Sequence, residues 1–147
     1  MPTRLYPFYC LQDARGRKTP PWRLYLPGRI SNPASGSSVT VYGLVDTGAD
    51  ATLLPASLAA HLGHDLKGDG VKARLTKGIE GAEITVYRHS SDVDLLTASG
   101  GAVARSFRNV LIDCSASDVP VLLGASDFLT HFSWSVDYRS GDLALDW

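Results

Sequence analysis

The chain has 147 residues, which is enough for one domain to bury a hydrophobic core without metals or disulfides. Hydrophobic residues make up 44% and charged residues 20% of the chain, a globular composition that excludes a disordered or fibrous protein. With 14 Lys and Arg against 15 Asp and Glu, the formal net charge is −1, so no overall basic field is available to bind nucleic acid.

The N-terminal residues are tested first for a targeting signal. They read MPTRLYPFYCLQDARG, and their short apolar patch is interrupted by Pro7 and ended by Asp13, so they lack the core of a signal peptide. No stretch approaches the roughly 18 consecutive apolar residues that span a bilayer. We therefore expect a cytoplasmic protein with no membrane partner, in which Cys10 and Cys114 are free thiols.

Short runs of alternating apolar and polar residues predict half-buried β-strands. Such runs occur at Trp22–Leu26 and Glu83–Tyr87. Near the C-terminus, residues 132–136 and 143–147 alternate on either side of a turn at 138–142, which predicts a hairpin. Turn-rich segments separate the runs, at residues 31–38, 67–70, 98–101 and 113–120. This spacing of short strands predicts an all-β barrel or sandwich.

Two short helices are expected between the strands. Residues 55–62 begin with Pro55 and are followed by Gly63, the usual asymmetry between the two ends of a helix. Residues 126–130 begin with Ser126, a good N-cap residue, and carry an acid in the first turn.

One carboxylate is distinguished by its position in the stretch VYGLVDTGADATLLP, residues 41–55. The apolar run predicts a buried strand that ends at Asp46, where Thr47 and Gly48 turn the chain. An acid so close to the core has to be hydrogen-bonded or paired, or its pKa rises, because desolvating the ionised form is costly. Asp-Thr-Gly is also ordinary turn chemistry, so these three residues alone leave a purely structural role open.

With its surroundings, this stretch resembles the active-site segment of the retropepsin-like aspartic proteases, the single-domain relatives of pepsin. Residues 46–50 (DTGAD) match the active-site motif, and residues 77–87 look like the Gly-flanked hairpin that forms the flap. Residues 121–124 (VLLG), followed by a short helix at 127–129, are similar to the apolar-apolar-Gly element and the helix after it. The resemblance covers residues 20–147 and leaves residues 1–19 as an N-terminal extension.

The resemblance implies an all-β fold, a closed or partly closed barrel with one or two short helices, that forms a homodimer and needs no metal or other cofactor. Peptide hydrolysis by this route uses two carboxylates that share one proton, one activating a water and the other polarising the carbonyl. The sequence contains one Asp-Thr-Gly and no Asp-Ser-Gly. The second carboxylate is therefore expected from Asp46 of another copy, across a two-fold axis.

Residue roles follow from the same resemblance. The catalytic set is Asp46, Thr47 and Gly48, in which the Thr hydroxyl bonds across the dimer axis and the Gly main chain helps to seat the acid. The expected substrate-binding residues are Ala49, Asp50, Gly78, Ile79, Glu80, Gly81 and Leu123. Ile79, at the flap tip, is expected to close over the substrate and exclude water.

The sequence departs from the family pattern in three places. Retroviral members usually have Arg after the late Gly, and this Arg pairs with the acid two residues after the motif Gly, whereas Gly124 is followed here by Ala125. Asp50 thus lacks its expected partner. The candidates to replace it are Arg4, Arg15, Arg17 and Arg139. The flap also carries a charge, Glu80, and residues 1–19 could be a pro-segment, part of the interface or a cover.

Other readings remain open at this level. A catalytically weak or inactive dimeric peptide-binding module of the same fold is the main alternative, and self-processing of the N-terminal segment is another. His61 and His64 are three residues apart, but we expect both to be exposed to solvent and not to bind a metal. Cys114 is expected to be buried or free and not a nucleophile. Three further acids are assigned to turns: Asp113, Asp118 and Asp137.

Overall fold

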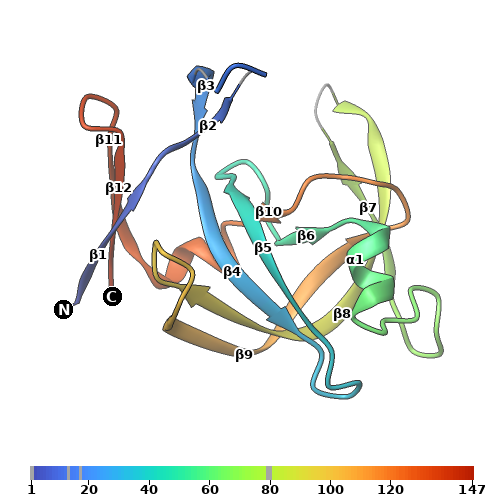
Figure 1. The fold of residues 1–147 in the computed structure, drawn as a ribbon. Helices are drawn as coiled ribbons and strands as arrows, with labels where there is room; N and C mark the ends of the chain where they lie inside the picture. Colours follow the sequence, from blue (N-terminus) through green and yellow to red (C-terminus); the bar gives the residue numbers. More distant parts are fainter. Residues whose placement is uncertain (1, 13, 17, 79–80) are drawn as a thin grey trace.

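The computed structural model of the chain describes residues 2–12, 14–16, 18–78 and 81–147, and only the main chain of residues 9–12 and 18–22. The elements are β1 (Thr3–Pro7), β2 (Tyr9–Gln12), β3 (Lys18–Arg23), β4 (Tyr25–Ser31), β5 (Ser38–Val45), β6 (Leu53–Leu54), α1 (Ala56–His61), β7 (Ala73–Lys77), β8 (Glu83–Leu96), β9 (Val103–Ser115), β10 (Leu122–Leu123), η2 (Leu129–His131), β11 (Ser133–Asp137) and β12 (Asp142–Asp146). Figure 1 shows their arrangement.

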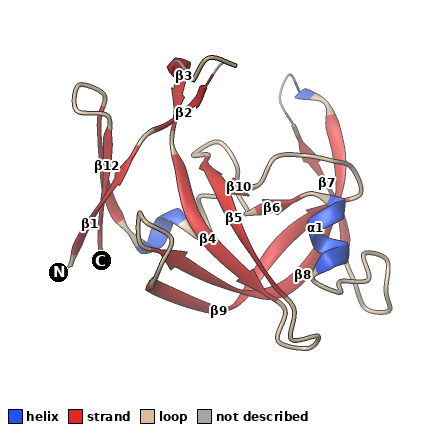
Figure 2. Cartoon of the chain, in the orientation of Figure 1, coloured by secondary structure: helices blue, strands red, loops and turns tan. Residues whose placement is uncertain are grey.

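Most of the strands form one ring-like sheet. Its strand order is β4-β5-β10-β6-β9-β8-β7, and an additional pairing between β4 and β8 closes the sheet on itself. The two long strands β8 and β9 form most of one wall, and the short helices lie at its margins (Figure 2). The predicted all-β class with short helices is confirmed. No helix among the described residues has the length and apolar character needed to cross a membrane.

The hydrophobic core has two clusters, because the terminal strands and helix α1 each pack against the ring. The larger cluster joins the ring to the terminal strands and includes Tyr6, Leu26, Leu95, Phe107 and Leu145. The smaller cluster lies under α1 and joins the helix to β4, β5 and β9. Together they hold the middle of the ring apolar, so that charged groups there need partners.

The chain ends form a separate three-stranded sheet with the order β1-β12-β11. β11 and β12 make the predicted C-terminal hairpin, and the carboxylate of Asp137 accepts main-chain bonds from Arg139 and Ser140 in its turn, which lowers the pKa of Asp137. β1, within the expected extension, pairs with β12. The hydroxyl of Tyr6 donates to the carbonyl of Leu96 at 2.8 Å, and burial raises the pKa of Tyr6 to about 12.

Two predicted elements differ from the structure. The strand predicted at 22–26 is divided at Leu24, because the chain changes partner there, from β2 to β5. The helix predicted at 126–130 is a turn followed by a 3-10 helix that begins at Leu129, and the Ser126 side chain is not its cap. The helix expected at 55–62 is confirmed as α1, with Pro55 as the N-cap residue.

Candidate active site

Asp46 is positioned by three neighbouring strands, β5, β10 and β6. β10 runs parallel to β5 and antiparallel to β6, so that Leu122 pairs with both Leu44 and Leu53. The amide of Leu44 donates to the carbonyl of Val121 at 2.9 Å, and the amide of Asp46 donates to the carbonyl of Leu123 at 3.2 Å. Asp46, which directly follows β5, is therefore fixed by the neighbouring strand β10 as well as by β5.

The turn after β5 holds the Asp46 carboxylate in place. The amide of Gly48 donates to Oδ1 of Asp46 at 2.9 Å, and the amide of Ala49 donates to the Asp46 carbonyl at 3.2 Å. Asp46 is half-buried while Thr47 and Gly48 are exposed. A hydrogen-bonded carboxylate at an accessible turn can act on a ligand or on a second copy of the chain without first being uncovered.

A close backbone approach explains why Gly124 follows β10. A Cβ added at Gly124 would lie 2.3 Å from the carbonyl carbon and 2.7 Å from the Cα of Ala51. Beside this contact, the amides of Ala125 and Ser126 donate to the carbonyls of Ala49 and Asp50, at 2.8 and 2.9 Å. Glycine thus lets the segment after β10 lie directly against the turn that carries Asp46.

Asp127, which the sequence predicted only as an acid in a helical turn, supports this turn from below. Its carboxylate accepts from the amide of Thr52 at 2.7 Å and from the Thr52 hydroxyl at 3.0 Å. The same hydroxyl accepts from the amide of Gly124 at 3.3 Å. Burial raises the pKa of Asp127, although the two bonds from Thr52 oppose the rise.

Asp113 is not a turn residue, as the sequence had suggested, but a buried anion in β9 with only 3% of its surface exposed. It accepts two bonds from the guanidinium of Arg74, and Nε of Arg88 lies 3.4 Å from its Oδ1. These arginines belong to β7 and β8, the two strands of the expected flap hairpin. The amide of Asp113 also donates to the carbonyl of Thr52 at 2.9 Å, which links the hairpin to the segment that follows the Asp46 turn.

Arg74 also interacts electrostatically with Asp50, and Arg17, one of the arginines proposed as the partner of Asp50, lies outside the described residues. The bond to Asp113 is the main reason that the pKa of Arg74 is raised, and the charges of Asp50 and Asp127 raise it further. Arg74 was not among the four arginines that sequence analysis proposed. It occupies a different element, β7, which is distant in sequence from the expected position after Gly124.

The predicted substrate-binding residues are found in three places. Ala49 and Asp50 follow Asp46 in the same turn, and the buried Leu123 lies in the adjacent strand β10. Gly78 and Gly81 lie at the connection of β7 and β8, where the amide of Gly81 donates to the carbonyl of Gly78 at 3.2 Å. Ile79 and Glu80, the expected flap tip, lie outside the described residues.

The other candidate groups have structural roles. Burial raises the pKa of the Cys114 thiol to about 12, which keeps this sulfur protonated and unreactive. His64 is half-buried, not exposed as predicted, because its Nε2 bonds the hydroxyl of Ser91 at 2.8 Å and its ring packs on His89. In the part of the chain that the structure describes, no three His, Cys, Asp or Glu side chains group together as metal ligands.

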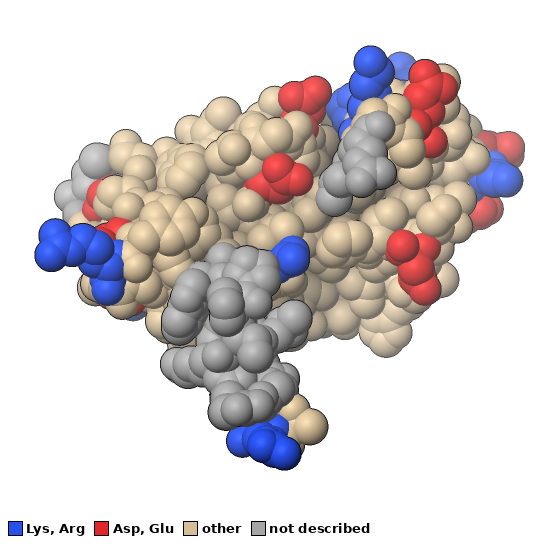
Figure 3. Space-filling model, turned by 90° about the horizontal axis from the view of Figure 1, so that it is seen from above, with Lys and Arg blue, Asp and Glu red and all other residues tan. Residues whose placement is uncertain are grey.

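Charges around this end of the molecule are mixed. Seen from above, acidic and basic groups are scattered among uncharged residues, in the area not covered by grey atoms (Figure 3). This distribution agrees with the net charge of −1, and the face that is visible carries charges of both signs.

Comparisons with known proteins agree with this geometry. The family model for aspartyl proteases matches residues 27–126, a range that contains the Asp46 turn, the β7–β8 hairpin and Gly124. Among solved structures, the chain is similar to a retropepsin-like aspartic protease from Rickettsia conorii, with a TM-score of 0.61 and 21% sequence identity over 99% of each chain. A search of curated proteins found no match. The chain belongs to the aspartyl protease family and has a retropepsin-like fold.

Proposed function

We propose that the protein is an aspartic endopeptidase whose active site forms when two copies bring their Asp46 carboxylates together. The position of Asp46 is the observation that carries this proposal. It lies at the end of β5, held by the amide of Gly48 at 2.9 Å, within the range that matches the aspartyl protease family. One carboxylate per chain is insufficient for a mechanism in which one acid activates water while the other polarises the carbonyl.

In the active form the two carboxylates share one proton, since two ionised carboxylates at close range repel each other. Thr47 is exposed beside Asp46 and is the residue we assign to the contact across the two-fold axis. The catalytic set is Asp46, Thr47 and Gly48, and the substrate is an extended polypeptide.

The β7–β8 hairpin is proposed as the flap. The strands pair in register from Ala73↔Tyr87 to Lys77↔Glu83, and the ion pairs of Arg74 and Arg88 with Asp113 hold the base of the hairpin in place. A hairpin with a fixed base can close over a peptide by moving its tip alone. In this proposal, Gly78, Ile79, Glu80 and Gly81 cover the peptide, while Ala49, Asp50 and Leu123 form the opposite side.

The test is cleavage of a diverse peptide mixture by the wild type and by Asp46→Asn, from about pH 4 to 7, read by mass spectrometry. Asp69→Asn, in an exposed turn, is the matched control for the same change of charge. We expect cuts by the wild type and the control and none by Asp46→Asn. Sedimentation of each protein should show a dimer in all three cases. Cleavage by purified Asp46→Asn would refute the proposed chemistry.

Peptide binding without cleavage by the wild type at every pH would instead identify a binding module of the same fold. The Asp46→Asn protein would then bind the same peptides as the wild type, because the loss of the carboxylate leaves the fold intact. A monomer in sedimentation, with no cleavage, would argue against the shared active site.

A further inference from the structure

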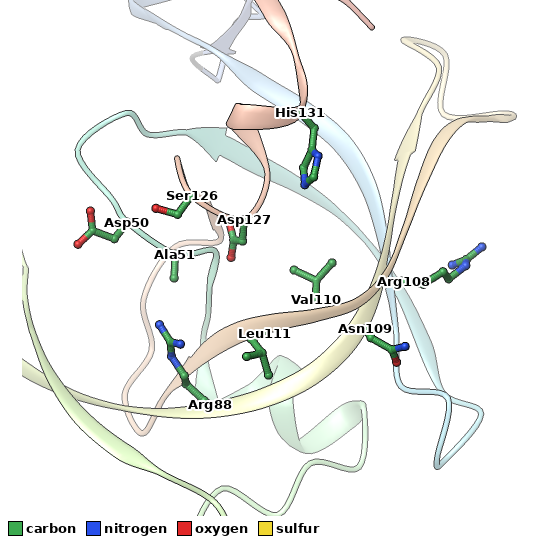
Figure 4. Close-up of a pocket in the computed structure, with 10 residues that line it drawn as sticks. All are labelled: Asp50, Ala51, Arg88, Arg108, Asn109, Val110, Leu111, Ser126, Asp127 and His131. Carbon is green, nitrogen blue, oxygen red and sulfur yellow. The ribbon is translucent and has the colours of Figure 1, made fainter.

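A pocket of about 410 Å³ opens next to the proposed active site, between β9 and the segment that follows Gly124 (Figure 4). Its volume lies within the usual range of ligand sites. Asp50 and Ala51 line one end, Val110 and Leu111 of β9 lie along one side, and Ser126 lies on the opposite side. Asp50 belongs to both the pocket and the catalytic turn, so that the two are continuous.

The edge of β9 along this pocket has no strand beside it. β8 pairs with one edge of β9, whereas β6 reaches only Asp113 and Cys114 on the other. Among the described strands, no pairing continues along this edge toward Leu111. A strand edge left open in this way presents main-chain donors and acceptors to its surroundings.

The register shows which main-chain groups face the pocket. Arg88 and Asp113 are directly opposite, yet their amides donate away from each other, to the carbonyls of Lys72 and Thr52 at 3.1 and 2.9 Å. Opposite pairs in an antiparallel ladder alternate between bonded and non-bonded. The pair two residues further, Ser90 with Leu111, is therefore also non-bonded. The N–H and C=O of Leu111 point away from β8, toward the pocket.

The charges of the pocket favour a polypeptide over a small ion. Its lining carries both signs, Asp50 and Asp127 against Arg88 and Arg108. These two acidic and two basic side chains balance within the lining, so no net field remains to select a small anion or a cation. An extended main chain, which has alternating donors and acceptors and no net charge, matches both the mixed lining and the open edge.

We propose that the β9 edge at Leu111 is a docking site for a distal, extended segment of the polypeptide substrate, which adds to β9 as a strand. This proposal rests on the proposed peptidase function and deepens it. A substrate that passes Ala49 and Asp50 reaches the pocket next, and the N–H and C=O of Leu111 bond its main chain. The enzyme therefore prefers long, extended polypeptides to short peptides with the same cleavage site.

The test compares a short peptide cut by the wild type with the same peptide extended on each side by about six residues, a typical strand length. Leu111→Pro removes the free N–H without removing a bond to β8, since that N–H points to the pocket. Leu111→Ala keeps the N–H and is the matched control. As a second route, Ser126→Tyr fills the pocket from its exposed opposite side, and Ser99→Tyr, in the turn between β8 and β9, is its surface control.

We expect the wild type to have a KM about five- to tenfold lower for the long peptide, the amount that two main-chain hydrogen bonds supply. Leu111→Pro and Ser126→Tyr should lose this preference, so that the ratio of the two KM values falls to about one, and both controls should keep it. If Pro unfolds the protein, the Ser126→Tyr and Ser99→Tyr pair decides. Equal kinetics for both peptides in the wild type would overturn the proposal, as would a preference retained by Ser126→Tyr.

A binding assay distinguishes failure of the peptidase proposal from failure of the docking proposal. Fluorescence anisotropy of the labelled long peptide with Asp46→Asn reports docking without turnover. If the wild type cleaves nothing, the peptidase proposal fails. Docking is then supported by binding that Ser126→Tyr weakens and Ser99→Tyr does not, and it is refuted by binding that both variants leave unchanged.

Discussion

Replacing Gly124 with alanine is expected to destabilise the fold at the point where β10 meets the turn that carries Asp46. The added Cβ would lie 2.3 Å from the carbonyl carbon of Ala51, about 1.1 Å inside the 3.4 Å at which ordinary contact begins. The atoms it meets are main chain, so no side chain can rotate away. Gly124 does not have a positive φ, so the cost comes from the contact and not from backbone strain.

The expected loss is about 3 kcal/mol in the free energy of unfolding, at the upper end of the range for overpacked sites. Gly43→Ala is the matched control, since it also adds one Cβ to a buried glycine beside β10. There the nearest atom is Cγ of the buried Leu123 at 2.7 Å, so the leucine side chain has to repack while the main chain stays in place. We expect this control to lose about 1 kcal/mol.

Both variants are measured by urea unfolding at one pH, followed by cleavage of a peptide that the wild type cuts. Gly124→Ala should also reduce cleavage, because Ala125 and Ser126 donate to the carbonyls of Ala49 and Asp50 and must move with Gly124. Equal stability of Gly124→Ala and the wild type would refute the reasoning. A larger loss for Gly43→Ala than for Gly124→Ala would refute it as well.

Three further predictions concern the charged groups around the turn. Asp113→Asn should lower the free energy of unfolding in urea by about 2 kcal/mol, less than for a fully buried pair because water reaches both arginines, and Asp118→Asn, which is exposed, should change it little. Burial raises the pKa of Asp127, so its contribution to stability is full at low pH and falls as the pH rises through that raised pKa. Asp127→Asn should therefore lose less stability than the wild type between about pH 4 and 7. Parallel curves of unfolding free energy against pH for the two proteins would contradict this. Burial, and then the nearby His89, lowers the pKa of His64, so stability should fall as the pH drops below 6.5, and His64→Gln should show a smaller fall in urea unfolding between about pH 7 and 5; an equal fall would exclude His64 as its source.

Local sequence signals predicted the parts of the fold that local interactions determine. Pro55 and Gly63 mark the ends of α1, and alternation predicts the hairpin of β11 and β12, because in each case the signal and the element share the same few residues. The turn at Asp46 belongs to this group. Two of its bonds, from the amides of Gly48 and Ala49 to Asp46, connect residues at most three apart in sequence.

The interactions that hold the Asp46 turn and its neighbours in place were missed, because the bonded residues are distant in sequence. Thr52 bonds Asp127, and Asp113 pairs with Arg74. No periodicity or spacing indicates such pairs, and an acid near Ser and Ala residues has the composition of a turn. The one available signal was the apolar run before Asp113, which is consistent with a buried strand that would need a cation for its acid.

The pairing of β1 with β12 has a consequence for how the chain folds. Thr3 lies opposite Asp146, so the terminal sheet cannot be completed before β12 has been synthesised. Contacts between such distant residues close a large loop and are slow to form. During synthesis, β1, which contains Tyr6, therefore remains unpaired until β12 is available. Because β1 and β12 lie side by side, a short covalent link between their outer ends would speed the formation of the terminal sheet and leave the turn that carries Asp46 unchanged.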